Sequence, residues 1–230
     1  MGRKSREKKR KKGIFIPQTI AGWLRNIGSM GGDLAFNEAL SFYLDTKGDI
    51  IRQMRCFSPD ELVWQTWMNI DKFISEDVQL KEKKCGKGCF HCCCMYAHVF
   101  DTEADTIMKY CLEKGIEIDP EALKSHIGKT EEDYIGSCNN RCVFLADDNS
   151  CRIYEARPGK CRLHMVATEP KMCALDESRT VGKLICINAE FVMAAFVELS
   201  YGTLDSSKQA GGNLADMLLA RLTSKPPKAF

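Results

Sequence analysis

The hydrophobic and polar positions along the chain predict a series of amphipathic helices. The clearest one starts after Ser58, a candidate N-cap, with Pro59 at the first helical position and Glu61 completing a capping box. Its apolar face is formed by Val63, Trp64, Trp67, Ile70, Phe73 and Ile74. We expect this helix to pack against shorter helical segments around residues 18–27 and 33–44.

More helices are predicted from residue 101 onward. Residues 101–112 fit one, with Gly115 as its stop signal. Its apolar face is formed by Ala104, Ile107, Met108 and Cys111, which places this cysteine in the core. A further helix begins at Pro120, after the capping residue Asp119, and two more cover residues 182–200 and 212–223.

One short β-hairpin is predicted between these helices. Residues 142–145 and 151–154 flank the turn sequence Asp147-Asp148-Asn149-Ser150. The expected fold is therefore mainly α, or α+β with a small hairpin, in which a helical body carries a cysteine-rich lobe.

Composition divides the chain into four regions. They are a basic disordered arm (1–13), an N-terminal helical region (14–84), a cysteine-cluster region (85–180) and C-terminal helices packed on the same core (181–230). The overall content, 44% hydrophobic and 28% charged residues in 230, is typical of a globular protein.

The net charge of +2 hides an asymmetry between the arm and the rest. Residues 1–12 carry eight Lys or Arg and one Glu, whereas the remainder carries 25 basic and 30 acidic residues. The basic start runs into a short apolar segment that Pro17 ends, which does not fit a secretory signal. No window of about 18 residues is free of polar residues. We therefore expect a cytoplasmic protein without a membrane contact.

Cysteine is the residue type that changes the picture most. The chain has 13 cysteines, 12 of them from Cys85 onward. A reducing cytoplasm disfavours disulfides, and consecutive cysteines cannot readily pair with one another. Metal binding is the better interpretation.

The spacing of the cysteines supports a soft metal. The first cluster reads Cys85-x3-Cys89-x2-Cys92-Cys93, with glycines between the first two thiols. Because neighbouring side chains in extended backbone point to opposite faces, Cys92 and Cys93 could serve different metals. Two four-thiolate sites and one multinuclear centre both fit the count. Nearby cations would partly offset the thiolate charge: Lys84, Lys87, Arg141, Arg152, Arg157, Lys160, Arg162 and Lys171.

These residues resemble the YkgJ-type cysteine-cluster proteins, a family described as zinc- or iron-chelating and named for a CxxCxxCC-like signature. The resemblance rests on the segments CGKGCFHCC, RCVFLADDNSCRIYEARPGKCR and EPKMC. It implies eight metal ligands: Cys85, Cys89, Cys92, Cys93, Cys142, Cys151, Cys161 and Cys173. The implied cofactor is zinc or iron, the latter as an ion or in an iron–sulfur cluster. Flagellin lysine methylases are similar in this region but longer, and nothing outside the cluster supports methyl transfer.

The remaining thiols and imidazoles receive simpler interpretations. Cys186 lies in an apolar stretch and is expected in the core, whereas Cys56 is isolated. Cys94 and Cys138 lie beside predicted ligands and stay ambiguous. His91, His98 and His164 are close to the cluster in sequence and are expected outside the ligand set.

Two alternative functions stay open. The spacing of Cys85, Cys89 and Cys92 also holds a [4Fe–4S] cluster in radical S-adenosylmethionine enzymes, although the parallel barrel of those enzymes is not predicted here. An iron–sulfur-dependent redox or S-adenosylmethionine-linked, methylase-like enzyme is therefore the first alternative. The second is weak nucleic-acid or polyanion contact through residues 3–12, where no aromatic residue could stack on bases.

Overall fold

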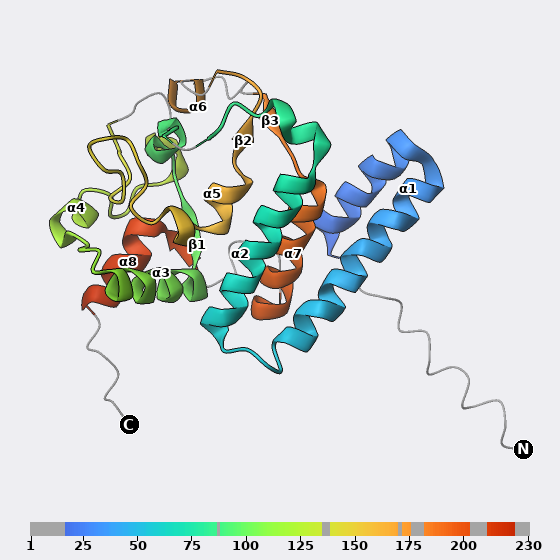
Figure 1. The fold of residues 1–230 in the computed structure, drawn as a ribbon, viewed down its shortest axis with the longest axis horizontal. Helices are drawn as coiled ribbons and strands as arrows, with labels where there is room; N and C mark the ends of the chain where they lie inside the picture. Colours follow the sequence, from blue (N-terminus) through green and yellow to red (C-terminus); the bar gives the residue numbers. More distant parts are fainter. Residues whose placement is uncertain are drawn as a thin grey trace, which may run out of the picture.

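Helices make up most of the described chain (Figure 1). The computed structural model describes residues 17–86, 88–134, 139–169, 172–175, 182–202 and 211–223, so the predicted basic arm and Cys138 lie outside it. The α-helices are α1 (Gln18–Gln53), α2 (Pro59–Glu76), α3 (Asp101–Lys114), α4 (Pro120–Lys124), α5 (Gly159–Leu163), α6 (Met172–Leu175), α7 (Ile187–Tyr201) and α8 (Leu214–Thr223). The 3-10 helices are η2 (Val78–Glu82), η3 (His91–Cys94), η4 (Glu131–Tyr134) and η5 (Tyr154–Ala156). The strands are β1 (His98–Phe100), β2 (Met165–Val166), β3 (Lys183–Leu184) and β4 (Gly211–Asn213).

Helix α2 begins as predicted, with a complete capping box. The Ser58 N–H donates to the Glu61 carboxylate at 2.8 Å, and Pro59 opens the helix. Four residues of the predicted apolar face are buried: Val63, Trp67, Ile70 and Ile74. The local signals in this segment therefore fixed both its start and its orientation.

The packing partner of α2 differs from the prediction. Helix α7 lies against both α1 and α2 and is the main neighbour of each (Figure 1). A direct contact between α1 and α2 is made by the rings of Phe42 and Phe73, whose centroids are 5.2 Å apart. Because α7 is apolar on nearly every side, it can fill the space between two amphipathic helices.

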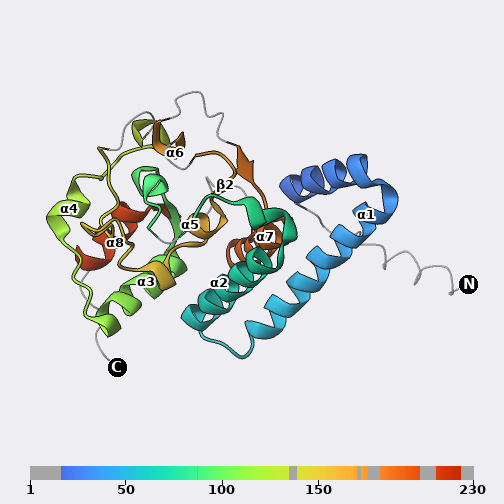
Figure 2. The same cartoon turned by 45° about the horizontal axis from the view of Figure 1, so that its top comes forward.

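The two predicted N-terminal segments form one helix with a sharp kink. Gly32 has φ 74° inside α1, and the two arms of the helix make a V beside α7 (Figures 1 and 2). The longer arm is fastened to α7 by Glu198, which accepts hydrogen bonds from Tyr43 and from Lys47, the latter at 2.7 Å. A positive φ that glycine tolerates allows the chain to turn back along α7.

The other half of the molecule is built from α3, α4, α8 and two small sheets. β1 pairs with β4 and β2 pairs with β3, each antiparallel. Gly211 on β4 fits closely against β1, since a Cβ there would lie 2.7 Å from the carbonyl oxygen of Val99. Asp119 caps α4 and Gly115 ends α3 with φ 64°, both as predicted.

Three predicted elements are shorter in the structure. The helix expected over residues 212–223 starts at Leu214, because residues 211–213 form β4. The helix expected over residues 182–200 starts at Ile187, because residues 183–184 pair with β2 instead. The expected hairpin is reduced to one antiparallel bridge between Leu145 and Cys151, closed by a hydrogen bond from the Ala146 N–H to the Ser150 carbonyl at 2.9 Å. The mainly α fold with small β pairs is nevertheless confirmed.

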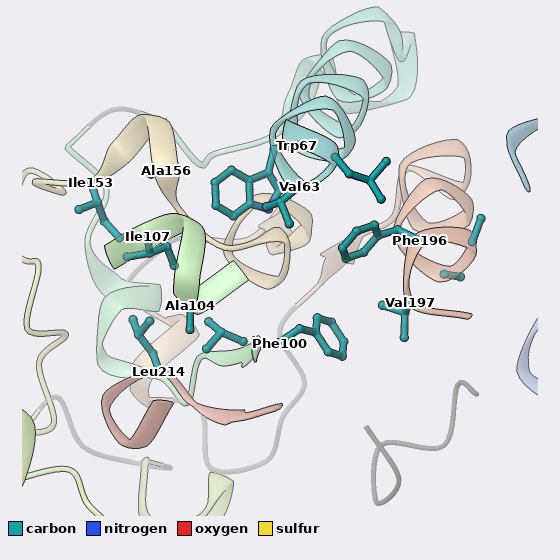
Figure 3. Packing of buried hydrophobic residues seen from close by; sticks show 14 of the residues in the cluster. Val63, Trp67, Phe100, Ala104, Ile107, Ile153, Ala156, Phe196, Val197 and Leu214 are labelled. Atoms are coloured by element: carbon teal, nitrogen blue, oxygen red, sulfur yellow. The ribbon is translucent and has the colours of Figure 1, made fainter. Parts of the chain in front are cut away.

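The main core lies where α2, α3, α7 and α8 meet (Figure 3). Trp67 and Val63 from α2 approach Ala104 and Ile107 of α3, and Phe196 of α7 closes the side toward α1. Cys111 is buried in this core, as predicted. Within the described residues, no helix is long and apolar enough to cross a membrane.

Candidate metal centre

Seven of the eight predicted ligands line one cavity of about 370 Å³. They are Cys85, Cys89, Cys92, Cys93, Cys142, Cys151 and Cys161. The eighth, Cys173, is buried on α6, which packs against η3, and its thiol interacts electrostatically with Cys85, Cys89 and Cys92. The structure thus brings together thiols that are up to 88 positions apart in the sequence.

The first cluster is shaped by a tight turn and a 3-10 helix. The Cys89 N–H donates to the Gly86 carbonyl at 3.0 Å, and Gly88 has φ 85°, a conformation that favours glycine. Cys92 and Cys93 follow on η3, where their thiols are hydrogen-bonded to each other. The expectation that they point to opposite faces is therefore wrong, because it assumed extended backbone.

The later cysteines reach the cavity from three short elements. The Cys142 N–H donates to the Cys93 carbonyl at 2.7 Å, which ties the segment after residue 139 to η3. Cys151 forms the antiparallel bridge with Leu145, and Cys161 lies on α5. Backbone pairing therefore positions Cys142 and Cys151, and helix α5 positions Cys161.

Cys92 is at the centre of the group. Its thiol interacts electrostatically with those of the other seven cysteines: Cys85, Cys89, Cys93, Cys142, Cys151, Cys161 and Cys173. Its hydrogen bond to Cys93 and its burial raise its pKa well above the usual thiol range. Burial also raises the pKa of Cys142 and of Cys173 to about 12. Without added positive charge, these thiols hold their protons at neutral pH.

Cationic side chains contribute part of that positive charge. Arg157 lines the cavity, and its positive charge partly opposes the rise in the pKa of Cys85, Cys92 and Cys151. Arg152 has the same effect on Cys151. Both were among the cations predicted to offset the cluster, whereas Lys87 and Lys171 lie outside the described residues. Burial still dominates, because every thiol pKa that is shifted here is shifted upward.

The thiols surround the cavity without converging on one point. In the described parts of the chain, no three or more His, Cys, Asp or Glu side chains are grouped so that they could hold a metal ion. The donor set nevertheless suits one, since thiolates are the preferred ligands of zinc and of iron–sulfur clusters. The ligand assignment itself stays a prediction.

A buried carboxylate that the sequence did not reveal fixes the segment that carries Cys161. Glu103 is fully buried on α3 and accepts hydrogen bonds from the Trp67 indole N–H at 2.9 Å, the Gly159 N–H at 2.8 Å and the Phe100 N–H at 3.2 Å. Gly159 is the first residue of α5. In the sequence, Glu103 looks like an ordinary acidic residue in the first turn of a helix, so no local signal could have found it.

A second contact holds α5 against α2. Arg162 is almost fully buried, donates to Asp71 on α2, and its guanidinium lies 5.1 Å from the ring centroid of Trp67. Its Nε donates to the Arg157 carbonyl at 2.9 Å. Arg162 was predicted to offset thiolate charge, and it lines the cavity and interacts electrostatically with Cys161; its other contacts also hold α5 in place.

The ambiguous thiols and imidazoles are placed as follows. Cys186 is buried and Cys56 is exposed, in agreement with their expected roles, and Cys94 is fully buried and is not among the free thiols. The His91 ring stacks on Phe90 and the His98 ring contacts Phe100. His164 lines the cavity.

Residues 84–184 match the model of the CxxCxxCC family, described as "Putative zinc- or iron-chelating domain". This segment covers 101 of the 230 residues and is similar to the CxxCxxCC domain. The resemblance to a cysteine-cluster family that the sequence carries is thereby confirmed. No match was found among curated proteins or among solved structures. The matched segment contains all eight predicted ligands, whereas α1, α2, α7 and α8 lie outside it.

Proposed function

We propose that the matched segment, residues 84–184, binds zinc or iron through cysteine thiolates. The proposed ligands are Cys85, Cys89, Cys92, Cys93, Cys142, Cys151, Cys161 and Cys173. The observation that carries the proposal is the clustering of seven of these thiols around one cavity, with the eighth packed beside it. A description as zinc- or iron-chelating for this segment agrees with it.

The electrostatics of the cluster support a bound cation. Thiolates in such proximity repel one another, and burial raises their pKa values, so deprotonation needs a positive centre among them. A zinc or iron centre supplies that charge and joins segments that are far apart in the sequence. Seven of the thiols share one cavity, which favours one contiguous centre over two separate sites.

The test is a metal and acid-labile sulfide assay on protein purified without oxygen. We expect zinc or iron in the wild-type chain and less of it in Cys89→Ser, which also becomes more sensitive to protease within residues 84–184, since metal binding couples to folding. Cys56→Ser is the matched control, because Cys56 is an exposed thiol outside the domain. Unchanged metal content in Cys89→Ser would overturn the proposal. Sulfide in the wild-type protein would identify an iron–sulfur cluster.

A further inference from the structure

The cavity extends well beyond the cysteines. A metal ion is held at about 2.0–2.3 Å from its ligands, so it fills only the space next to the thiols. A volume of about 370 Å³ lies within the range of pockets that hold small organic molecules. The remainder of the cavity is lined by α5, β2, β3 and the first turn of α7.

Four polar side chains gather at this second end. Lys160, His164, Lys183 and Glu190 all line the cavity. Both lysines interact electrostatically with His164 and also with Glu190, so the four groups face one another.

His164 lies on the cavity wall beside both lysines. The two lysines are exposed to solvent, so they lie at the entrance.

Charge and surface chemistry narrow the class of ligand. The lysines outnumber Glu190, so this end attracts an anion. Arg157 adds a further positive charge to the cavity wall. Between these polar groups the wall is apolar, formed by Ile74, Leu163, Met165, Leu184 and Ile185.

We propose that this end of the cavity binds a small organic anion, a carboxylate or phosphate ester with an apolar part, through Lys160 and Lys183. The anionic group lies between the lysines, and the apolar part lies against Leu184 and its neighbours. The site goes beyond the proposed metal centre and uses none of its thiols.

The test is a ligand-observed NMR titration of the full chain with four probes that share one ring. Phenyl phosphate and benzoate are the anions, benzamide is neutral and benzylamine is a cation. We expect saturable binding of at least one anion, at least tenfold tighter than that of benzamide or benzylamine. The anion that binds more tightly shows whether the site prefers a phosphate or a carboxylate.

Variants locate the binding. Lys183→Gln and Lys160→Gln should each weaken binding of the anion about tenfold or more, whereas Lys81→Gln, which changes an exposed lysine outside the cavity, should leave it within twofold. Because Lys183 is exposed, its variant is expected to fold. Equal affinity for benzamide or benzylamine, or anion binding unchanged in Lys183→Gln, would overturn the inference. Metal content is measured in the same samples, so that a failure of the metal proposal is seen separately.

Discussion

Replacement of Glu103 tests whether this buried carboxylate on α3 holds α2, α3 and α5 together. Helix α5 carries Cys161, one of the proposed metal ligands. Three donors from three segments point at it: the indole of Trp67 on α2, the N–H of Phe100 before α3, and the N–H of Gly159 at the start of α5. In Glu103→Ala all three lose their acceptor inside the core. In Glu103→Gln the amide oxygen can keep two of the bonds, but the amide nitrogen faces the Phe100 N–H.

The expected magnitudes follow from that count. Each buried donor left without a partner costs about 1–3 kcal/mol. The variant also removes a fully desolvated carboxylate, whose pKa is raised by burial, so the desolvation cost of that carboxylate offsets part of the loss. We expect Glu103→Ala to lower the free energy of unfolding by about 3–5 kcal/mol. The loss in Glu103→Gln should be roughly 1–2 kcal/mol. At about 2–4 °C per kcal/mol for a chain of this size, the alanine variant should melt roughly 10 °C lower.

The assay is urea unfolding followed by circular dichroism, with metal content measured on the same samples. Glu113→Ala is the control, because Glu113 is an exposed residue on the same helix, and it should stay within about 0.5 kcal/mol of wild type. Glu103→Ala should also hold less metal, because the segment that carries Cys161 loses its anchor at Gly159. The reasoning is refuted if Glu103→Ala loses less than about 1 kcal/mol, or if Glu103→Gln is as unstable as Glu103→Ala.

Three shorter predictions concern the sheet, the core and the thiols. Gly211→Ala should cost about 1–3 kcal/mol in urea unfolding, since its Cβ would meet the Val99 carbonyl at 2.7 Å; a neutral effect would contradict the close fit. Cys111→Ala should lose about 1 kcal/mol of stability and keep the wild-type metal content, because this buried thiol packs in the core; metal loss would make it a ligand. Burial raises the pKa of Cys142 and Cys173 to about 12, so metal binding must displace thiol protons, and metal affinity should fall as the pH is lowered; a flat competition assay between pH 8 and pH 6 would contradict this.

The features that sequence analysis predicted depend on neighbouring residues. The capping box at Ser58, the stop at Gly115 and the turn before Cys151 are decided within a few positions, and each is found in the structure. The features it missed depend on distant contacts. The residues near Gly32 do not indicate that α7 packs against both α1 and α2. The residues near Glu103 do not indicate that its carboxylate accepts hydrogen bonds from three segments.

The cysteine domain, residues 84–184, depends both on signals from neighbouring residues and on contacts between distant ones. Its architecture explains why it needs the rest of the chain. Apart from α3, its elements are short: η3, α5 and β2 each have five residues or fewer, too few to be stable in isolation. Those around Cys161 are held from outside the domain by α2, through Asp71 and Trp67. The helices therefore supply a rigid wall, and the short segments supply thiols that a metal can draw together. On this view, metal removal should loosen the cysteine segments while α1, α2 and α7 stay folded, which hydrogen exchange with and without a chelator can measure. Equal loss of protection in those three helices would mean that the core also depends on the metal.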